Sequence, residues 1–175
     1  MASVRTLARL AIVGMAIAGF GSSPLAGQGF GGSLAVGGYG SSNSLRTNVG
    51  VGASLVGRVT SRSGFGVGLG ARVIRYESED NGFAFLEVQY APAPTLTRRI
   101  QPIAGLRAGL YRAAGDFDDD PRFGLEGGPV GGIAIRAGGG VSLTLTGDLG
   151  IILDSNLYFG QRRFIPGAQV GITLH

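Results

Sequence analysis

Polar and apolar residues alternate over the segment 141–153, which reads VSLTLTGDLGIIL. Val141, Leu143 and Leu145 share one parity, whereas Ser142 and Thr144 begin the other. A period of two residues predicts a β-strand with one apolar and one polar face. At about 13 residues, the segment is longer than the usual soluble strand and long enough to cross a bilayer at a tilt.

The same alternation recurs along the chain and predicts about eight strands. Their apolar positions lie within 30–39, 49–59, 65–73, 84–90, 104–110, 133–135, 141–153 and 168–174. The connections expected at one end are 60–64, 91–94 and 137–140, of which the middle one is longer. Polar, longer loops are expected at the other end, over 41–48, 76–82, 113–124 and 154–163. This layout is typical of an all-β, antiparallel up-and-down transmembrane β-barrel.

Alternation alone does not say which face points outward. In a soluble barrel the apolar face lines the interior, whereas in a membrane barrel it meets lipid. The strand lengths and the small Gly, Ser and Thr residues of the polar face favour the membrane orientation. Aromatic residues near the strand ends favour it too, because interfacial girdles need such rings. They are Phe30, Phe65 and Tyr90 toward one end and Phe123, Tyr158 and Phe164 toward the other.

The N-terminal segment has the layout of a secretory signal. Arg5 and Arg9 precede an uncharged apolar run over 10–20, and Leu25-Ala26-Gly27 offers small residues for cleavage. A membrane anchor needs roughly 20 apolar residues, which this run lacks. We therefore expect a cleaved signal peptide over 1–27 and a barrel over 28–175.

Composition removes two further possibilities. The chain has no cysteine, so it carries neither a disulfide nor a lipidated cysteine. Its net charge is +4, all 15 basic residues are arginines, and no basic run exceeds two residues. Without a polybasic tail, a nucleic-acid-binding role is not supported.

Seven ionisable residues fall inside the predicted strands, each on the face opposite the aliphatic residues. They are Arg58, Arg72, Glu87, Arg107, Glu126, Arg136 and Asp148. Folding the chain about 76–82 sets Arg72 opposite Glu87, and the other loops set Arg107 and Asp148 at similar heights. We therefore predict a salt-bridge cluster of Arg72, Glu87, Arg107 and Asp148 that fills a narrow lumen. A pore lining for small anions is the alternative interpretation of these arginines.

Candidate catalytic and metal-binding residues are few. The single histidine is His175, and we expect no Ser or Asp partner at that terminal position, so the sequence predicts no enzyme and no cofactor. A catalytic site based on Asp is the alternative. The segment Asp116–Asp120 has the opening spacing of a calcium loop, but Pro121 and Gly127 occupy the positions of the turn glycine and the bidentate glutamate. We expect no metal site, although divalent ions bridging this loop to lipid headgroups remain open.

The chain resembles the small outer-membrane barrels of the OmpA transmembrane-domain, OmpX and opacity-protein type. The likeness covers 31–175 and includes the closing segment Gly167–His175, in which Val170, Ile172 and Leu174 alternate. His175 stands where such barrels commonly end in Phe.

The resemblance implies an integral protein of the bacterial outer membrane, exported through the periplasm. The expected partners are outer-membrane lipids, lipopolysaccharide and the barrel-assembly machinery, with the protein monomeric. Members of this group act as structural anchors, adhesins, narrow channels or enzymes, so the group does not determine a function. Our first hypothesis is a non-enzymatic structural or surface-interaction role. The alternatives are a narrow channel for small solutes and a soluble periplasmic barrel with an apolar ligand inside.

Overall fold

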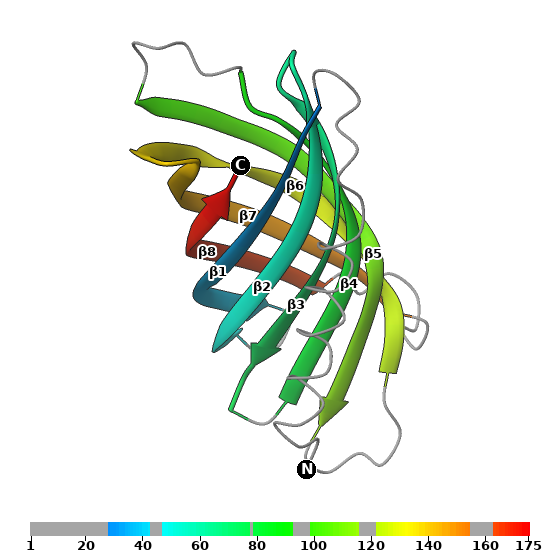
Figure 1. The fold of residues 1–175 in the computed structure, drawn as a ribbon. Helices are drawn as coiled ribbons and strands as arrows, with labels where there is room; N and C mark the ends of the chain where they lie inside the picture. Colours follow the sequence, from blue (N-terminus) through cyan, green and yellow to red (C-terminus); the bar gives the residue numbers. More distant parts are fainter. Residues whose placement is uncertain (1–27, 43–46, 78, 93–98, 116–121, 155–162) are drawn as a thin grey trace, which may run out of the picture.

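Eight antiparallel strands close into one barrel in the computed structural model of the protein (Figure 1). The structure describes residues 28–42, 47–77, 79–92, 99–115, 122–154 and 163–175, so the expected signal peptide lies outside the described residues. The strands are β1 (Gln28–Ser42), β2 (Thr47–Ser61), β3 (Phe65–Arg75), β4 (Glu79–Tyr90), β5 (Ile100–Gly115), β6 (Arg122–Gly138), β7 (Val141–Asp154) and β8 (Arg163–Leu174). The predicted fold class is therefore confirmed.

Each strand pairs with the next along the chain, and β8 returns to pair with β1. Gly64 turns β2 into β3 at a φ of 91°, and Gly138, Gly139 and Gly140 turn β6 into β7 with φ angles of 105°, 60° and 77°. Glycine adopts this left-handed region without a Cβ penalty, which explains the glycine-rich turns. We call the end of the barrel that carries these turns the terminal end, because β1 begins and β8 finishes there. The opposite end is the loop end.

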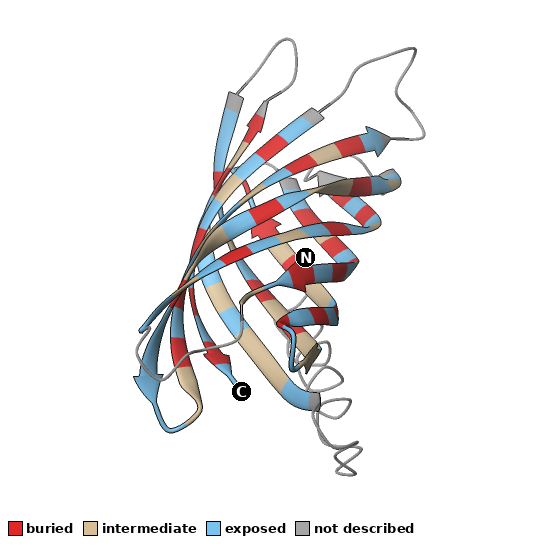
Figure 2. Cartoon of the chain, turned by 90° about the horizontal axis from the view of Figure 1, so that it is seen from above, coloured by how far each residue is buried: buried red, intermediate tan, exposed pale blue. Residues whose placement is uncertain are grey.

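The apolar face of the barrel points outward. Leu106 on β5 is 65% exposed, whereas its neighbour Arg107 is 9% exposed. Buried and exposed residues alternate in this way along the strands (Figure 2). An outward aliphatic surface suits lipid rather than water. The soluble barrel with an apolar interior is therefore wrong. Among the described residues, no helix is long and apolar enough to span a membrane.

Exposed aromatic rings lie near both ends of the barrel wall. Phe30, Phe65 and Tyr90 are exposed at the terminal end, where the last two rings are 4.7 Å apart between centroids. Phe123 and Phe164 are exposed at the loop end. Tyr158, the remaining residue of the expected girdle, lies outside the described residues. This placement fits rings at the two interfaces of a bilayer.

The strands extend farther into the expected loops than the alternation indicates, and this shifts one predicted pairing. β3 ends at Arg75 and β4 already begins at Glu79, so Arg72 lies opposite Phe83 and not opposite Glu87. Glu87 lies opposite Arg107 on β5. The predicted pairing of Arg72 was therefore wrong, because its partner on β4 lies four residues before Glu87. Polar residues at the start of β4 continue the backbone ladder, so their polarity did not mark a loop.

Glycine also lets neighbouring strands approach closely inside the barrel. A Cβ built on Gly37 of β1 would overlap the carbonyl oxygen of Ala168 on β8. A Cβ on the next residue, Gly38, meets nothing within 4 Å. These adjacent residues on one strand therefore differ in whether a side chain fits.

We expect Gly37→Ala to lower the free energy of unfolding by about 1–3 kcal/mol, because the β1–β8 seam must open to admit the methyl group. Gly38→Ala, the matched control, should change it by less than about 0.5 kcal/mol. Urea unfolding of the refolded barrel, followed on unheated gels, measures both. Equal stability of the two variants would contradict the close approach.

Candidate functional site

The lumen is the candidate functional site, because the buried charged side chains of the barrel point into it. Its loop-end half is filled by an apolar layer of buried side chains. We define this apolar layer as Tyr39, Ile74, Tyr76, Tyr111, Ala113, Ile152 and Ile165. In an eight-stranded barrel, the interior is only just wide enough for such side chains. The layer therefore fills the lumen at that level.

Six charged residues form an ion-pair network next to the apolar layer. We call it the lumen cluster: Arg58, Arg72, Glu87, Arg107, Glu126 and Asp148. Arg72 donates to Glu126 and to Asp148. Arg107 donates from Nε to Glu87 over 2.6 Å and lies 3.4 Å from Asp148 through Nη1. Glu87 also accepts from Arg58.

These ion pairs mostly join strands that are not neighbours in the sheet. Arg72 of β3 reaches across the lumen to Glu126 of β6 and Asp148 of β7. Arg58 of β2 reaches Glu87 of β4. Only the pair of Arg107 and Glu87 joins adjacent strands. The cluster therefore ties opposite walls of the barrel, which the backbone ladder alone does not do.

Aromatic and amide side chains surround the cluster. The guanidinium of Arg72 lies 5.0 Å from the ring centroids of both Tyr39 and Phe83, and that of Arg107 lies 4.9 Å from Phe85. Gln169 of β8 donates to Asp148 over 3.2 Å. Arginine stacks on ring faces while its edge stays free for carboxylates, so these contacts add to the ion pairs.

The structure brings the four residues of the predicted cluster together, and it adds Arg58 and Glu126. Both were placed on the inward face by parity, but their heights were not assigned. Arg136, also on that face, is exposed near the terminal end. The apolar layer was missed altogether. Its signal was present, because Ile74 and Ile152 share the parity of Arg72 and Asp148 on their strands.

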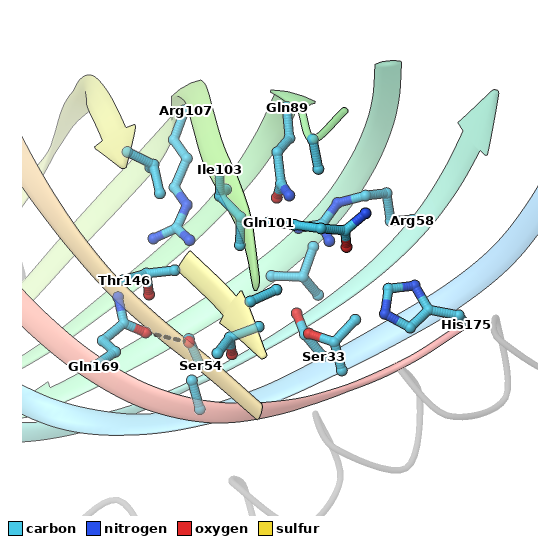
Figure 3. A pocket seen from close by; sticks show the side chains of 17 residues that line it. Ser33, Ser54, Arg58, Gln89, Gln101, Ile103, Arg107, Thr146, Gln169 and His175 are labelled. Carbon is cyan, nitrogen blue, oxygen red and sulfur yellow. Dashed lines mark hydrogen bonds between the residues drawn. The ribbon is translucent and has the colours of Figure 1, made fainter. Parts of the chain in front are cut away.

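A small polar cavity lies between the cluster and the terminal end (Figure 3). Its volume is about 50 Å³. Arg58 and Arg107 of the cluster line it, together with Gln89, Gln101 and His175. The remaining lining is mostly Ser, Thr and small aliphatic residues. The lumen therefore keeps a cavity with polar and small aliphatic lining residues toward the terminal end, whereas apolar side chains fill it toward the loop end.

His175 does have a serine partner, contrary to the expectation from its terminal position. Its Nε2 lies 2.9 Å from Oγ of Ser142, the second residue of β7. The backbone brings them together, because the His175 N–H donates to Gly140 over 2.8 Å. Ser142 is only 1% exposed and does not line the cavity, so a substrate carbonyl has no approach to its hydroxyl. The pair therefore closes the barrel wall and does not form an accessible nucleophile.

Within the described ranges, no group of three or more His, Cys, Asp or Glu side chains is placed to hold a metal ion. The three carboxylates of the cluster are engaged by arginines. The acidic segment 116–120 lies outside the described residues, so its interaction with divalent ions stays a prediction.

Comparisons with known structures identify the fold. Neisserial surface protein A matches with a TM-score of 0.73 and 13% identity, over 85% of this chain and 99% of that one. Ail, the attachment invasion locus protein of Yersinia pestis, matches with a TM-score of 0.53 and 11% identity, over 86% and 99%. The outer membrane enzyme PagL matches with a TM-score of 0.49 and 14% identity, over 83% and 99%. No protein-family model and no curated protein matches the sequence.

Because the sequence identities are low, these matches show a shared fold and nothing more. The fold is that of the integral barrels of the bacterial outer membrane, and the outward aliphatic surface fits it. The chain has the fold of the small outer-membrane β-barrels, as the sequence predicted. Such a fold hosts unrelated activities, so function has to be argued from the lumen and the surface.

Replacing Arg72 should be costly, because it leaves Glu126 and Asp148 buried without their shared cation. We expect Arg72→Met to lower the free energy of unfolding by about 3–5 kcal/mol. Arg75→Met on the same strand is the matched control. Its side chain is 79% exposed and 3.7 Å from Asp80, so the loss should stay below about 1 kcal/mol. Urea titration of both variants measures the difference, and similar losses would contradict a stabilising role for the cluster.

His175 offers a second test. Partial burial, together with the nearby Arg136 and Arg58, lowers the pKa of its imidazole. The folded state then binds the proton less readily than the unfolded state. The stability contributed by the neutral ring is therefore complete above the ordinary pKa of about 6.5 and is lost as the pH falls from there through the lowered pKa.

We expect an NMR titration of this single histidine to give a pKa below 6.5, and Arg136→Gln to raise that pKa toward the ordinary value. Arg75→Gln, at the other end of the barrel, should leave it unchanged. A histidine that titrates normally in the folded wild type would contradict the packing around Ser142.

Proposed function

We propose that the protein is a non-enzymatic outer-membrane protein whose role is structural or is exerted through surface interaction. The observation that carries the proposal is the filled lumen. The apolar layer and the lumen cluster occupy successive levels of the interior, and their side chains come from every strand of the barrel. A barrel built in this way has no continuous passage through its interior at these levels, so larger molecules meet its wall and its loops.

The surface supports a lipid partner. Aliphatic side chains cover the outward face between the two sets of exposed aromatic rings. Outer-membrane lipids, including lipopolysaccharide, are the molecules that such a belt contacts. We infer that the protein acts as a monomer, because a closed barrel leaves no strand edge among the described residues to pair with a second chain.

A narrow channel is the second candidate, and the cavity at the terminal end favours it. Arg58 and Arg107 line this cavity, which is partly open to solvent. Conduction would require passage through both the lumen cluster and the apolar layer. The ion pairs span opposite walls, so opening that route would break several of them at once. The closed barrel is therefore the better-supported proposal.

An enzymatic role is the least supported. The serine and histidine that meet at the terminal end are positioned by the strand end, but the serine hydroxyl is buried. A general base needs a nucleophile that a substrate can reach. No such pair is present among the other described residues that line the cavity.

The refolded protein in a planar bilayer should show no stepwise single-channel conductance, because the apolar layer excludes water and ions. A shift in mobility between unheated and heated gel lanes would confirm that the inserted protein is folded. Tyr39→Ala combined with Tyr111→Ala removes two large side chains of the layer and should increase the current if the layer is the main barrier. Discrete conductance steps from the folded wild type would favour the channel instead.

A further inference from the structure

The six charges of the lumen cluster balance in number but are unevenly distributed along the barrel axis. Toward the terminal end, two arginines, Arg58 and Arg107, share the carboxylate of Glu87. Toward the loop end, Arg72 faces two carboxylates, those of Glu126 and Asp148. The 3.4 Å contact of Arg107 with Asp148 connects the two halves. One positive charge is therefore in excess on the side of the cavity, and one negative charge on the side of the apolar layer.

The lining of the cavity has the same sign. Arg58 and Arg107 line it, whereas Glu87, their shared partner, does not. No Asp or Glu is among the described residues that line the cavity. Arg58 also has a buried Nε without a hydrogen-bond acceptor in the described part of the chain. The cationic groups of this half of the cluster are therefore less completely paired than its carboxylate.

Neutral hydrogen-bond donors stand beside these arginines. Gln89 is buried on β4, and Figure 3 shows it with Arg58 and Arg107 along one side of the cavity. The Gln101 amide lies nearby, held by a 2.8 Å hydrogen bond from its Nε2 to the carbonyl of Pro92. A guanidinium beside amide and hydroxyl donors is the arrangement that recognises a carboxylate or another oxyanion.

The size of the cavity limits the ligand. A volume of about 50 Å³ holds about four water molecules, at the ~10–15 Å³ that one water requires. Acetate has a comparable number of non-hydrogen atoms, whereas an aromatic carboxylate is too large. The single excess positive charge matches an anion with one negative charge.

We infer that the terminal-end cavity is a binding site for a small monovalent oxyanion of the size of formate or acetate, held by Arg58 and Arg107 with Gln89. The anion lies on the cationic side of the lumen cluster and neutralises its excess charge. The cavity lies between the lumen cluster and the terminal end, so the site binds its anion there without transport through the barrel. It is thus compatible with a closed lumen and does not depend on the role proposed above.

The site can be tested by titrating sodium acetate into the isotope-labelled barrel, refolded in detergent, at constant ionic strength maintained with sodium chloride. We expect saturable NMR shifts of the Gln89 and Gln101 side-chain amides with a dissociation constant in the millimolar range. Formate should bind similarly. Shifts that do not saturate, or benzoate binding as tightly as acetate, would overturn the proposal.

Matched variants identify the groups responsible. Arg58→Gln should weaken acetate binding about tenfold or more, and Arg58→Lys should retain most of it, because the charge remains. Arg75→Gln removes an exposed arginine at the loop end and should change nothing. An equal loss in that control would show that the shifts report only general charge screening, which overturns the site.

Gln89→Leu keeps the test decisive if the Arg58 variants do not fold. Gln89 makes no ion pair in the lumen cluster, so the folded mobility on unheated gels should persist. Acetate binding should weaken several-fold, because a donor beside the arginines is lost. Unchanged affinity in a folded Gln89→Leu barrel would remove the amide from the site and contradict the proposed arrangement.

Discussion

Pairing of buried charges across the lumen is the interaction on which the rest of this structure depends. The six residues of the lumen cluster come from six consecutive strands, β2 to β7. Gln169 adds β8 through Asp148, and Tyr39 adds β1 through the guanidinium of Arg72. All eight strands therefore contribute to one network of contacts. Backbone hydrogen bonds hold each strand to its neighbours, whereas these side chains also join walls that face one another, as the apolar layer does beside them.

The buried charges lie inside the barrel because its outward face is aliphatic, as suits a wall in contact with lipid. An arginine on the lipid face costs about 2–4 kcal/mol near the middle of a bilayer, which fits the inward parity of the six charged residues of the lumen cluster. Arg75, Asp80 and Arg112, on the outward parity, lie near the loop-end strand ends. Once inside, they lose water, and each needs a partner of opposite sign. Three arginines with three carboxylates meet that requirement as a group. The predicted cluster of four residues was incomplete. Arg58 belongs to the same network because it shares Glu87 with Arg107, and Glu126 belongs to it because it pairs with Arg72.

The lumen changes character along its axis, and this decides what it can do. Tyr39, Tyr111 and the isoleucines around them fill the loop-end half, whereas the terminal-end half keeps a polar cavity. The ion pairs lie between the two. A lumen of this kind supports our proposal of a barrel without a continuous passage. The contact of Ser142 with His175 joins the C-terminal end of β8 to β7. The Ser142 hydroxyl is too buried to act on a substrate.

Parity along the chain determined which residues share a face. Because side chains alternate with a period of two, Leu106 and Arg107 had to face opposite sides, and the same pattern predicted about eight two-faced strands. The order of the strands and their closure into a barrel are shown by the tertiary structure. The sequence did not determine register. Polar residues such as Asp80 and Asn81 continue a strand as readily as they form a loop, and four residues of extra ladder moved Arg72 from Glu87 to Phe83. Contacts across the lumen depend on the register of every seam between two strands, so the partners of Arg72, the apolar layer and the polar cavity were decided only when the barrel closed.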